Sequence, residues 1–283
     1  MAVLRVEDLT VGYGGAGPGG RPPVLEGLSL QVQAAQVVSL VGPSGSGKST
    51  LLRTIAGLLA PQRGQVELAV PRTELGILFQ DDALLPWRTA RENVALGLRI
   101  RGMPAHQALE EADRWLARMG LRGLERRFPH QLSGGQRKRV ALTQVLCLRP
   151  RLLLMDEPFA SLDAILRVHL TQELLRWVEQ EGCAVLLVTH DLEEALALSD
   201  RVYVLSRGPR ARVRGVYEVP FGRPRDIVAV KGEPLFARLA AQLWQDLHSE
   251  VAWEQGALAG AGGPPGEGEV SRDGRFSRAV AWR

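Results

Sequence analysis

Hydrophobic and polar residues alternate along much of the first 40 positions, which predicts an antiparallel β subdomain whose strands have one face toward solvent. The apolar positions that carry this alternation are Leu4, Val6, Leu9, Leu28, Leu30 and Val32. A stretch rich in Gly and Pro, Gly14–Pro23, lies between them and predicts a surface loop. Val37–Val41 is almost continuously apolar and therefore predicts a buried strand.

From about Pro86 to Pro150 the apolar residues follow helical spacing, and no strand pattern intervenes. The three helices predicted there are Ala90–Arg101, Pro104–Met119 and Ser133–Leu148. Strands are predicted outside this region at Leu75–Phe79, Leu152–Met155, Ala184–Thr189 and Arg201–Leu205, and helices at Leu51–Leu59, Ala164–Gln180 and Leu192–Leu198. Strands that alternate with helices indicate an α/β fold with a mostly parallel sheet, interrupted by a helical insertion.

The pattern fades after about Trp244. Leu235–Leu247 keeps helical spacing and is expected to dock on the core, whereas the Gly-rich stretch after about residue 255 predicts disorder. We therefore expect a domain over residues 1–235, with its helical subdomain at about 86–150, and a C-terminal extension over 236–283.

Composition narrows the class of protein. The chain has 283 residues, 45% of them hydrophobic, and a net charge of +4 that is not gathered into basic runs, so nucleic acid is not an expected partner. No apolar stretch reaches the roughly 20 residues that a membrane-spanning helix needs. Cys147 and Cys183 lie far apart, match no metal-ligand spacing, and favour a reducing compartment.

The segment Gly42–Thr50 fits the phosphate-binding pattern G-x-x-x-x-G-K-[ST] between a predicted strand and a predicted helix. Its backbone N–H groups can converge on phosphates at the positive end of the helix. We expect Lys48 to reach the β- and γ-phosphates of ATP and Ser49 to bind Mg²⁺. The nucleotide-binding residues predicted here are Gly42, Pro43, Ser44, Gly45, Ser46, Gly47, Lys48, Ser49 and Thr50.

Two carboxylates, Asp156 and Glu157, end the apolar strand that begins at Leu152. Asp156 is predicted to hold Mg²⁺, directly or through water, and Glu157 to polarise the attacking water as a general base. The alternative is that Glu157 only caps the next segment.

Between these motifs lies Leu132–Gln136, with the sequence L-S-G-G-Q. A small hydroxyl and two glycines at the start of a helix make a second anion-binding terminus, although a plain serine N-cap is the alternative. This pentapeptide resembles the signature of the ATP-binding-cassette (ABC) family. The resemblance implies that two copies sandwich two ATP molecules, each closed by Ser133, Gly134, Gly135 and Gln136 of the partner copy.

The resemblance implies roles for four further residues. Gln80 resembles the glutamine that contacts Mg²⁺ and water and senses the transporter, and His190 resembles the switch histidine at the γ-phosphate. Asp163, in Ser161–Leu162–Asp163, resembles the residue that faces the second subunit. Tyr13 resembles the aromatic residue that stacks on adenine, although the glycine-rich stretch after it could displace it. Taken alone, Gln80 and His190 would be ordinary structural residues.

The absence of an expected membrane span favours an importer subunit that works with separate permease subunits, and through them with a solute-binding protein. The segment Phe79–Trp87, with Leu-Leu-Pro-Trp, resembles cassettes for nitrate, sulfonate and taurine uptake, and also those for thiamine-pyrimidine precursors. Trp87 is then either a contact of the membrane subunit or core of the helical subdomain. The implied location is the cytoplasmic face of the membrane.

Two other classes remain open. A cassette ATPase that regulates a nucleic-acid process would bind DNA or RNA in a salt-sensitive way. A binding module without turnover would lack a catalytic residue of the family pattern, and none is missing.

Overall fold

The computed structural model describes residues 1–14, 21–160 and 162–259, and side chains as far as His248; it contains two sheets. The larger sheet has the strand order β5-β6-β7-β3-β8-β9, and its first five strands run parallel. These strands are β3 (Val37–Val41), β5 (Leu75–Leu78), β6 (Leu152–Asp156), β7 (Ala184–Val188), β8 (Arg201–Leu205) and β9 (Val213–Glu218). Only β9 pairs antiparallel in this sheet. The predicted α/β class and mostly parallel sheet are confirmed.

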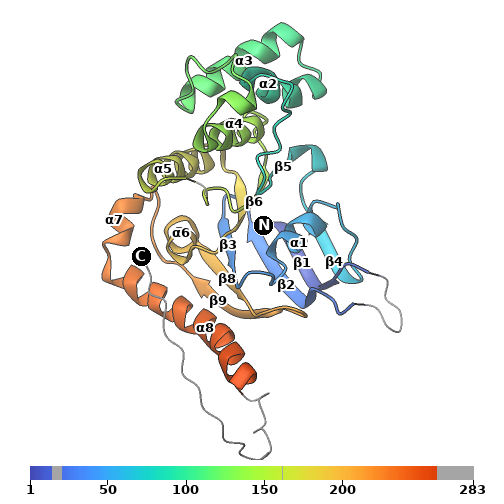
Figure 1. Cartoon of the computed structure of the whole chain (residues 1–283), viewed down its shortest axis with the longest axis vertical. Coiled ribbons are helices and arrows are strands. Elements are labelled where there is room, and N and C mark those ends of the chain that lie inside the picture. Colours follow the sequence, from blue (N-terminus) through green and yellow to red (C-terminus); the bar gives the residue numbers. More distant parts are fainter. Residues whose placement is uncertain (15–20, 161, 260–283) are drawn as a thin grey trace, which may run out of the picture.

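A three-stranded antiparallel sheet lies against one face of the larger sheet (Figure 1). It comprises β1 (Ala2–Val11), β2 (Leu25–Gln33) and β4 (Arg63–Leu68) in the order β2-β1-β4. The alternation predicted for the first 40 residues is therefore an antiparallel pair. The predicted loop Gly14–Pro23 falls partly on residues 15–20, which lie outside the described residues.

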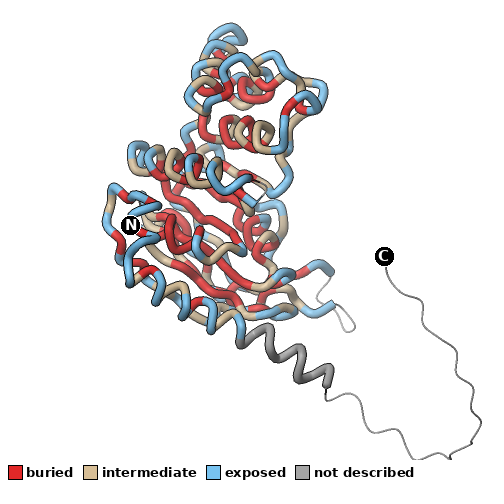
Figure 2. Tube along the Cα trace, turned by 60° about the vertical axis from the view of Figure 1, so that its left-hand side comes forward, coloured by how far each residue is buried: buried red, intermediate tan, exposed pale blue. Residues whose placement is uncertain are grey.

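Both faces of the parallel sheet are covered, which is why its central strands are apolar at nearly every position. Val38 and Leu40 on β3 pack with the antiparallel sheet and with α1 (Lys48–Ile55). Val37 and Val41 point to the opposite face, which α5 (Ala164–Glu181) and α6 (Leu192–Leu198) cover. Figure 2 shows these strands as a continuous buried layer through the body of the molecule.

The predicted helical insertion is present between β5 and β6 and forms the top of the molecule in Figure 1. It contains α2 (Ala90–Ile100), α3 (Ala105–Arg118) and α4 (Gly134–Leu146), with a short 3₁₀ turn at Pro129–Gln131. Another 3₁₀ turn, Arg72–Glu74, precedes β5. The side chain of Thr89 caps α2 and Ser133 caps α4, each in a reciprocal pair with the third helical residue.

The last two helices described are α7 (Ile227–Lys231), which precedes the predicted C-terminal extension, and α8 (Pro234–Ala259), which continues into it. Phe236 and Leu243 of α8 are buried in the main core, so the predicted docking of this helix is confirmed. The predicted disorder from about residue 255 begins too early, because α8 continues to Ala259. Good helix formers such as Glu254 and Leu258 continue the helix past the single Gly256. The rest of that prediction falls on residues 260–283, outside the described residues.

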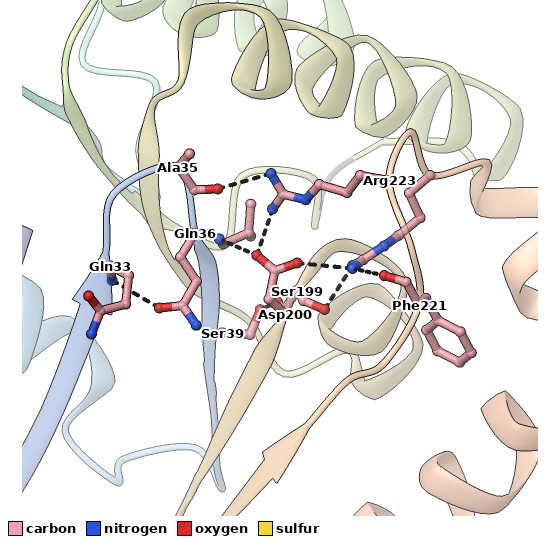
Figure 3. A network of polar contacts seen from close by, with 10 residues as sticks. Gln33, Ala35, Gln36, Ser39, Ser199, Asp200, Phe221 and Arg223 are labelled. Atoms are coloured by element: carbon pink, nitrogen blue, oxygen red, sulfur yellow. Dashed lines mark hydrogen bonds and ion pairs between the residues drawn. The ribbon is translucent and has the colours of Figure 1, made fainter. Parts of the chain in front are cut away.

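A buried ion network ties the segment before α7 to the amino-terminal edge of the parallel sheet (Figure 3). Asp200, at the start of β8, accepts hydrogen bonds from the backbone of Val37 at 2.9 Å and from Arg225 at 3.0 Å. Arg223 donates to Asp200 at 2.6 Å and to the carbonyl of Ala35 at 2.9 Å. Arg225 also donates to the carbonyls of Ser199 and Phe221, both at 2.7 Å. Its side chain has no exposed surface.

Three elements have no counterpart in the sequence pattern: β4, β9 and α7. The strand β4 has the sequence R-G-Q-V-E-L and is largely exposed, so it carries little apolar signal and is held by its pairing with β1. The predicted helix Leu51–Leu59 is shifted in the structure, where α1 begins at Lys48 and ends at Ile55. Gly57, in a left-handed conformation, follows its end.

Across the part of the chain that the structure describes, no helix is long and apolar enough to cross a membrane.

Candidate functional site

The carboxyl ends of three neighbouring parallel strands bring the predicted motifs together. Val188 at the end of β7 pairs with Leu40 of β3 on one side and with Asp156 of β6 on the other. Beyond the strand, Thr189 donates its N–H to the carbonyl of Leu40 at 3.3 Å, and Glu157 donates its N–H to the carbonyl of Val188 at 2.8 Å. The phosphate-binding motif, the two carboxylates and the switch histidine therefore share one edge of the sheet, where open α/β sheets bind ligands.

The segment Gly42–Thr50 forms a loop that closes on itself before α1. Lys48 Nζ donates to the carbonyl of Gly42 at 2.8 Å and to that of Pro43 at 3.0 Å. Gly47 has φ +92°, and a Cβ atom there would lie 2.6 Å from Val24 Cγ1, so this position requires glycine. Ser46 Oγ is buried and has no hydrogen-bond partner among the described residues. A ligand oxygen at the loop would satisfy a donor of this kind.

Lys48, Asp156 and Glu157 form a partly buried charged group. Burial lowers the pKa of Lys48, and the charges of Glu157 and Asp156 oppose that change. Burial raises the pKa of Asp156, while a hydrogen bond from the Ser49 side chain lowers it. Ser49 and Asp156 thus contact each other, as the prediction of a shared Mg²⁺ requires. Hydroxyl and carboxylate oxygens are the ligands that Mg²⁺ prefers, so the donor set fits this ion.

Glu157 and His190 lie in direct contact, with Nδ1 of the imidazole 3.1 Å from Oε1 of the carboxylate. The Glu157 side chain is 20% exposed and that of His190 is 60% exposed, so both remain accessible to a small ligand. Glu157 adopts a left-handed backbone conformation, φ +47°, which is uncommon for a residue with a side chain. Strain of this kind gathers at functional sites and favours a catalytic role over a simple cap.

Gln80 follows the end of β5 at an exposed position, and a buried lysine holds its backbone. Lys138 on α4 donates from Nζ to the carbonyl of Gln80 at 2.9 Å, and its Nζ lies 3.8 Å from an Asp82 oxygen. Burial lowers the pKa of Lys138, and Asp82 raises it. The sequence pattern missed Lys138. Its only signal in the sequence was its position as the sixth residue of the predicted helix Ser133–Leu148.

The segment that presents Trp87 is held by the one asparagine in the chain, Asn93. Its side chain accepts from the N–H of Leu85 at 2.7 Å and donates to the carbonyls of Leu85, Arg88 and Thr89 at 3.2, 3.1 and 3.0 Å. Trp87 itself is 70% exposed. It is therefore a surface residue and not part of the core of the helical subdomain.

Tyr13 lies beside α1, the helix whose first turn ends the phosphate-binding motif. Its hydroxyl is 3.4 Å from Thr50 Oγ1 and accepts from Arg53 at 3.2 Å. The residue is 47% exposed, so its ring remains accessible to a ligand. Tyr13 thus lies next to the end of the phosphate-binding loop.

The signature residues lie elsewhere, on the helical subdomain. Ser133 caps α4 by accepting from the N–H of Gln136 at 3.3 Å, and Gln136 accepts from the N–H of Ser133 at 2.9 Å. Figure 1 places α4 in the upper part of the molecule and α1 in the lower body. Asp163 caps α5, accepting from Leu166 at 2.9 Å, and Ser161 of the same motif lies outside the described residues. Within one chain, Ser133 thus makes the serine N-cap that the alternative interpretation expects, and it remains exposed.

Comparison with known proteins gives the same assignment. A family model described as "ABC transporter" matches residues 25–160. The chain is 40% identical over 245 residues to the taurine import ATP-binding protein TauB of Escherichia coli O157:H7, covering 83% of this chain and 92% of that protein. The chain belongs to the ABC transporter family. Another relative is an uncharacterized ABC transporter ATP-binding protein of Methanocaldococcus jannaschii, 41% identical over 81% of this chain and 86% of its own length.

Solved ABC cassettes share the fold. An ATP-binding cassette determined as a dimer in a post-hydrolysis state with ADP and Pi superimposes with a TM-score of 0.69 at 30% identity, over 77% of this chain and all of that one. These comparisons confirm the predicted family, the P-loop fold with its two added subdomains, and an ATPase that binds nucleotide.

The cysteines form no part of this site. Cys147 and Cys183 are both buried, and burial raises the pKa of each thiol to about 12. A thiol of so high a pKa is unreactive at neutral pH. In the described part of the chain, no group of three or more His, Cys, Asp and Glu side chains is arranged to hold a metal ion.

Glu194, on α6 beside the site, is a buried carboxyl that the sequence pattern did not single out. Burial raises its pKa from 4.5 to about 7. Between these values the folded chain holds a proton that the unfolded chain has lost, so this group makes folding less favourable as pH rises. Glutamine cannot ionise, and we expect the unfolding free energy of Glu194→Gln minus that of the wild type to grow by about 2 kcal/mol from pH 5 to pH 7.5. Urea unfolding at both pH values measures it, and a constant difference would contradict the raised pKa.

Proposed function

We propose that this chain is the ATP-hydrolysing subunit of an ABC importer for a small sulfonate of the taurine type. The observation that carries this is the 40% identity to the taurine import ATP-binding protein, which extends over 92% of that protein. An importer of a thiamine-pyrimidine precursor or of another small solute is the alternative, because the solute is bound by other subunits of such a transporter.

For the nucleotide we propose that the loop Gly42–Thr50 binds the phosphates, with Lys48 as the counter-charge. The unpartnered Ser46 hydroxyl and the charge of Lys48 both support this. Tyr13 would stack on the adenine, since its ring is half exposed beside α1. Ser49, Asp156 and Gln80 would hold Mg²⁺, and that ion would neutralise charge on the phosphate oxygens.

For hydrolysis we propose that Glu157 accepts the proton of the attacking water. Its carboxylate lies at the end of β6, one residue beyond Asp156, and in contact with His190 Nδ1. His190 would orient Glu157 through this contact and present its other ring nitrogen to the γ-phosphate. Both side chains are positioned before substrate binds, which reduces the reorganisation that the reaction requires.

We further propose that two copies of the chain form the active unit. Ser133, Gly134, Gly135 and Gln136 are exposed or half-exposed at the start of α4 and belong to a different subdomain from the phosphate loop, and Asp163 is exposed as well. A second copy could therefore supply them to a nucleotide that this copy binds. The dimeric form of the solved cassette with ADP and Pi supports the arrangement.

We propose that the chain works at the cytoplasmic face of the membrane, where its remaining partners are separate membrane-spanning permease subunits and, through them, a solute-binding protein. The exposed Trp87 is the proposed permease contact, because exposed aromatic residues often anchor interfaces. The rigid set of hydrogen bonds from Asn93 presents this side chain. No nucleic-acid partner is proposed.

Purification of the membrane-associated complex tests the assignment. We expect two copies of this chain to co-purify with a multi-span permease. In vesicles that also receive the solute-binding protein, we expect taurine to stimulate ATP hydrolysis more than nitrate or a pyrimidine does. Stimulation by a pyrimidine alone would favour the alternative substrate, and a soluble dimer bound to nucleic acid would contradict the importer.

Lys48→Ala should weaken ATP binding by about 30- to 100-fold, because the variant loses charge-assisted hydrogen bonds to the phosphates. Titration calorimetry with ATP measures the change. Lys231→Ala is the matched control: this lysine is exposed and pairs with Glu193, so its removal should leave ATP affinity unaltered. Equal affinity of Lys48→Ala and the wild type would refute the phosphate-binding role.

A further inference from the structure

We propose that Glu194, together with Asp191 and Arg167, positions the switch histidine His190 and links it to Leu162, the residue before Asp163. This inference rests on the proposed catalytic role of Glu157 and His190.

The link begins at the residue before the histidine. Thr189 Oγ1 lies 2.6 Å from Glu194 Oε2, and the same hydroxyl accepts the N–H of Asp191 at 3.1 Å. One hydroxyl thus ties together the residues on both sides of His190. Thr189 is 2% exposed and Glu194 is 8% exposed, whereas the His190 side chain is 60% exposed. The backbone of the histidine is held firmly while its ring remains open to substrate.

The link continues through α6 to α5. Asp191 Oδ1 accepts the N–H of Glu194 at 3.0 Å and so caps α6. Its other oxygen pairs with Arg167 Nη1 at 3.2 Å, and Arg167 Nη2 donates to the carbonyl of Leu162 at 3.2 Å. Arg167 therefore joins the Leu162 carbonyl to Asp191, the residue that follows His190.

The two carboxylate oxygens of Glu194 differ in their surroundings: Oε2 accepts the hydrogen bond from Thr189, and Oε1 is left to carry or lose a proton. Its Oε1 is buried and has no hydrogen-bond partner among the described residues. The pKa of this carboxyl is raised to about 7: burial and the charge of Asp191 raise it, whereas the hydrogen bond from Thr189 and the charges of Arg167 and His190 lower it. Glu193 and Lys231 are the other charged groups around the adjoining cavity of about 170 Å³.

The contacts require a carbonyl or carboxylate oxygen at position 194, and not a negative charge. Glutamine can accept the Thr189 hydroxyl, whereas leucine fills a similar volume and cannot. If Glu194 acts through Thr189, removal of either partner breaks the same hydrogen bond. Two such changes then have no larger effect than one.

A double-mutant cycle on the ATPase activity of the full-length chain tests the proposal. We expect Glu194→Leu and Thr189→Val each to lower kcat about tenfold with KM for ATP within twofold of the wild type, and the double variant to be no slower than either. Glu194→Gln should stay within threefold of the wild-type kcat. Thr143→Val is the control, because the hydrogen bond of this buried hydroxyl stays within its own helix and goes to the carbonyl of Arg139.

Other outcomes overturn the proposal. Wild-type kcat in Glu194→Leu, or losses that multiply to about a hundredfold in the double variant, would exclude an action through Thr189. A kcat of Glu194→Gln as low as that of Glu194→Leu would exclude the hydrogen bond as the cause. A wild-type chain without ATPase activity, alone or in its complex, would instead refute the proposed function together with this inference.

Discussion

A Glu157→Gln variant is expected to bind ATP with the affinity of the wild type and to hydrolyse it about 100- to 10,000-fold more slowly, the usual contribution of a general base. Glutamine keeps the size and hydrogen-bonding oxygen of the side chain but cannot accept the proton from water. The contact with His190 at 3.1 Å places the lost base in the middle of the site. Single-turnover hydrolysis and ATP titration on the same preparation separate the two effects.

Glu193→Gln is the matched control for this substitution. Glu193 lies only three residues beyond His190, but its side chain is 62% exposed and pairs with Lys231. We expect its hydrolysis rate to remain within about twofold of the wild type, as surface ion pairs contribute little. Turnover by Glu157→Gln at a rate near that of the wild type would show that another group activates the water.

The second large effect is expected in stability. Arg225→Leu should lower the unfolding free energy by about 3–5 kcal/mol, because it leaves part of Asp200 and the carbonyls of Ser199 and Phe221 without their donor in a buried site. The network lies at the amino-terminal edge of the sheet, opposite the phosphate loop. ATP affinity of the folded variant should therefore be unaltered. Urea unfolding and ATP titration measure both quantities.

Arg223→Leu is the control, since it removes an arginine from the same aspartate. The Arg223 side chain is 24% exposed and so can be replaced in part by water, and we expect a loss of about 1 kcal/mol. Similar losses for the two variants would show that burial of Arg225 does not determine the strength of this network. Arg225→Met, which retains more of the apolar contact of the arginine stem, distinguishes loss of the ion pair from loss of packing.

Local sequence patterns were sufficient to predict elements that are mostly buried and loops that require a particular residue type. The run Val37–Val41 and the bounds of β8 and α6 follow from apolar spacing alone, because most of the residues in these elements are buried. The phosphate loop follows from Gly47 and Lys48, since a left-handed backbone and a cation are both required there. In contrast, β4 takes its strand conformation from its neighbour β1 and has little apolar character of its own.

By itself the sequence determined the order of elements, the helical insertion, the phosphate loop and the residue types that reach the nucleotide, because short-range spacing and backbone conformation dictate each of these. Only the tertiary structure decided which of those residues meet. The register of β6, β7 and β3 brings Glu157 to His190, and the packing of α5 on α6 brings Arg167 to Asp191. Buried groups such as Lys138, Glu194 and Arg225 escaped detection because the charge is visible in sequence, whereas burial and partners depend on segments distant along the chain.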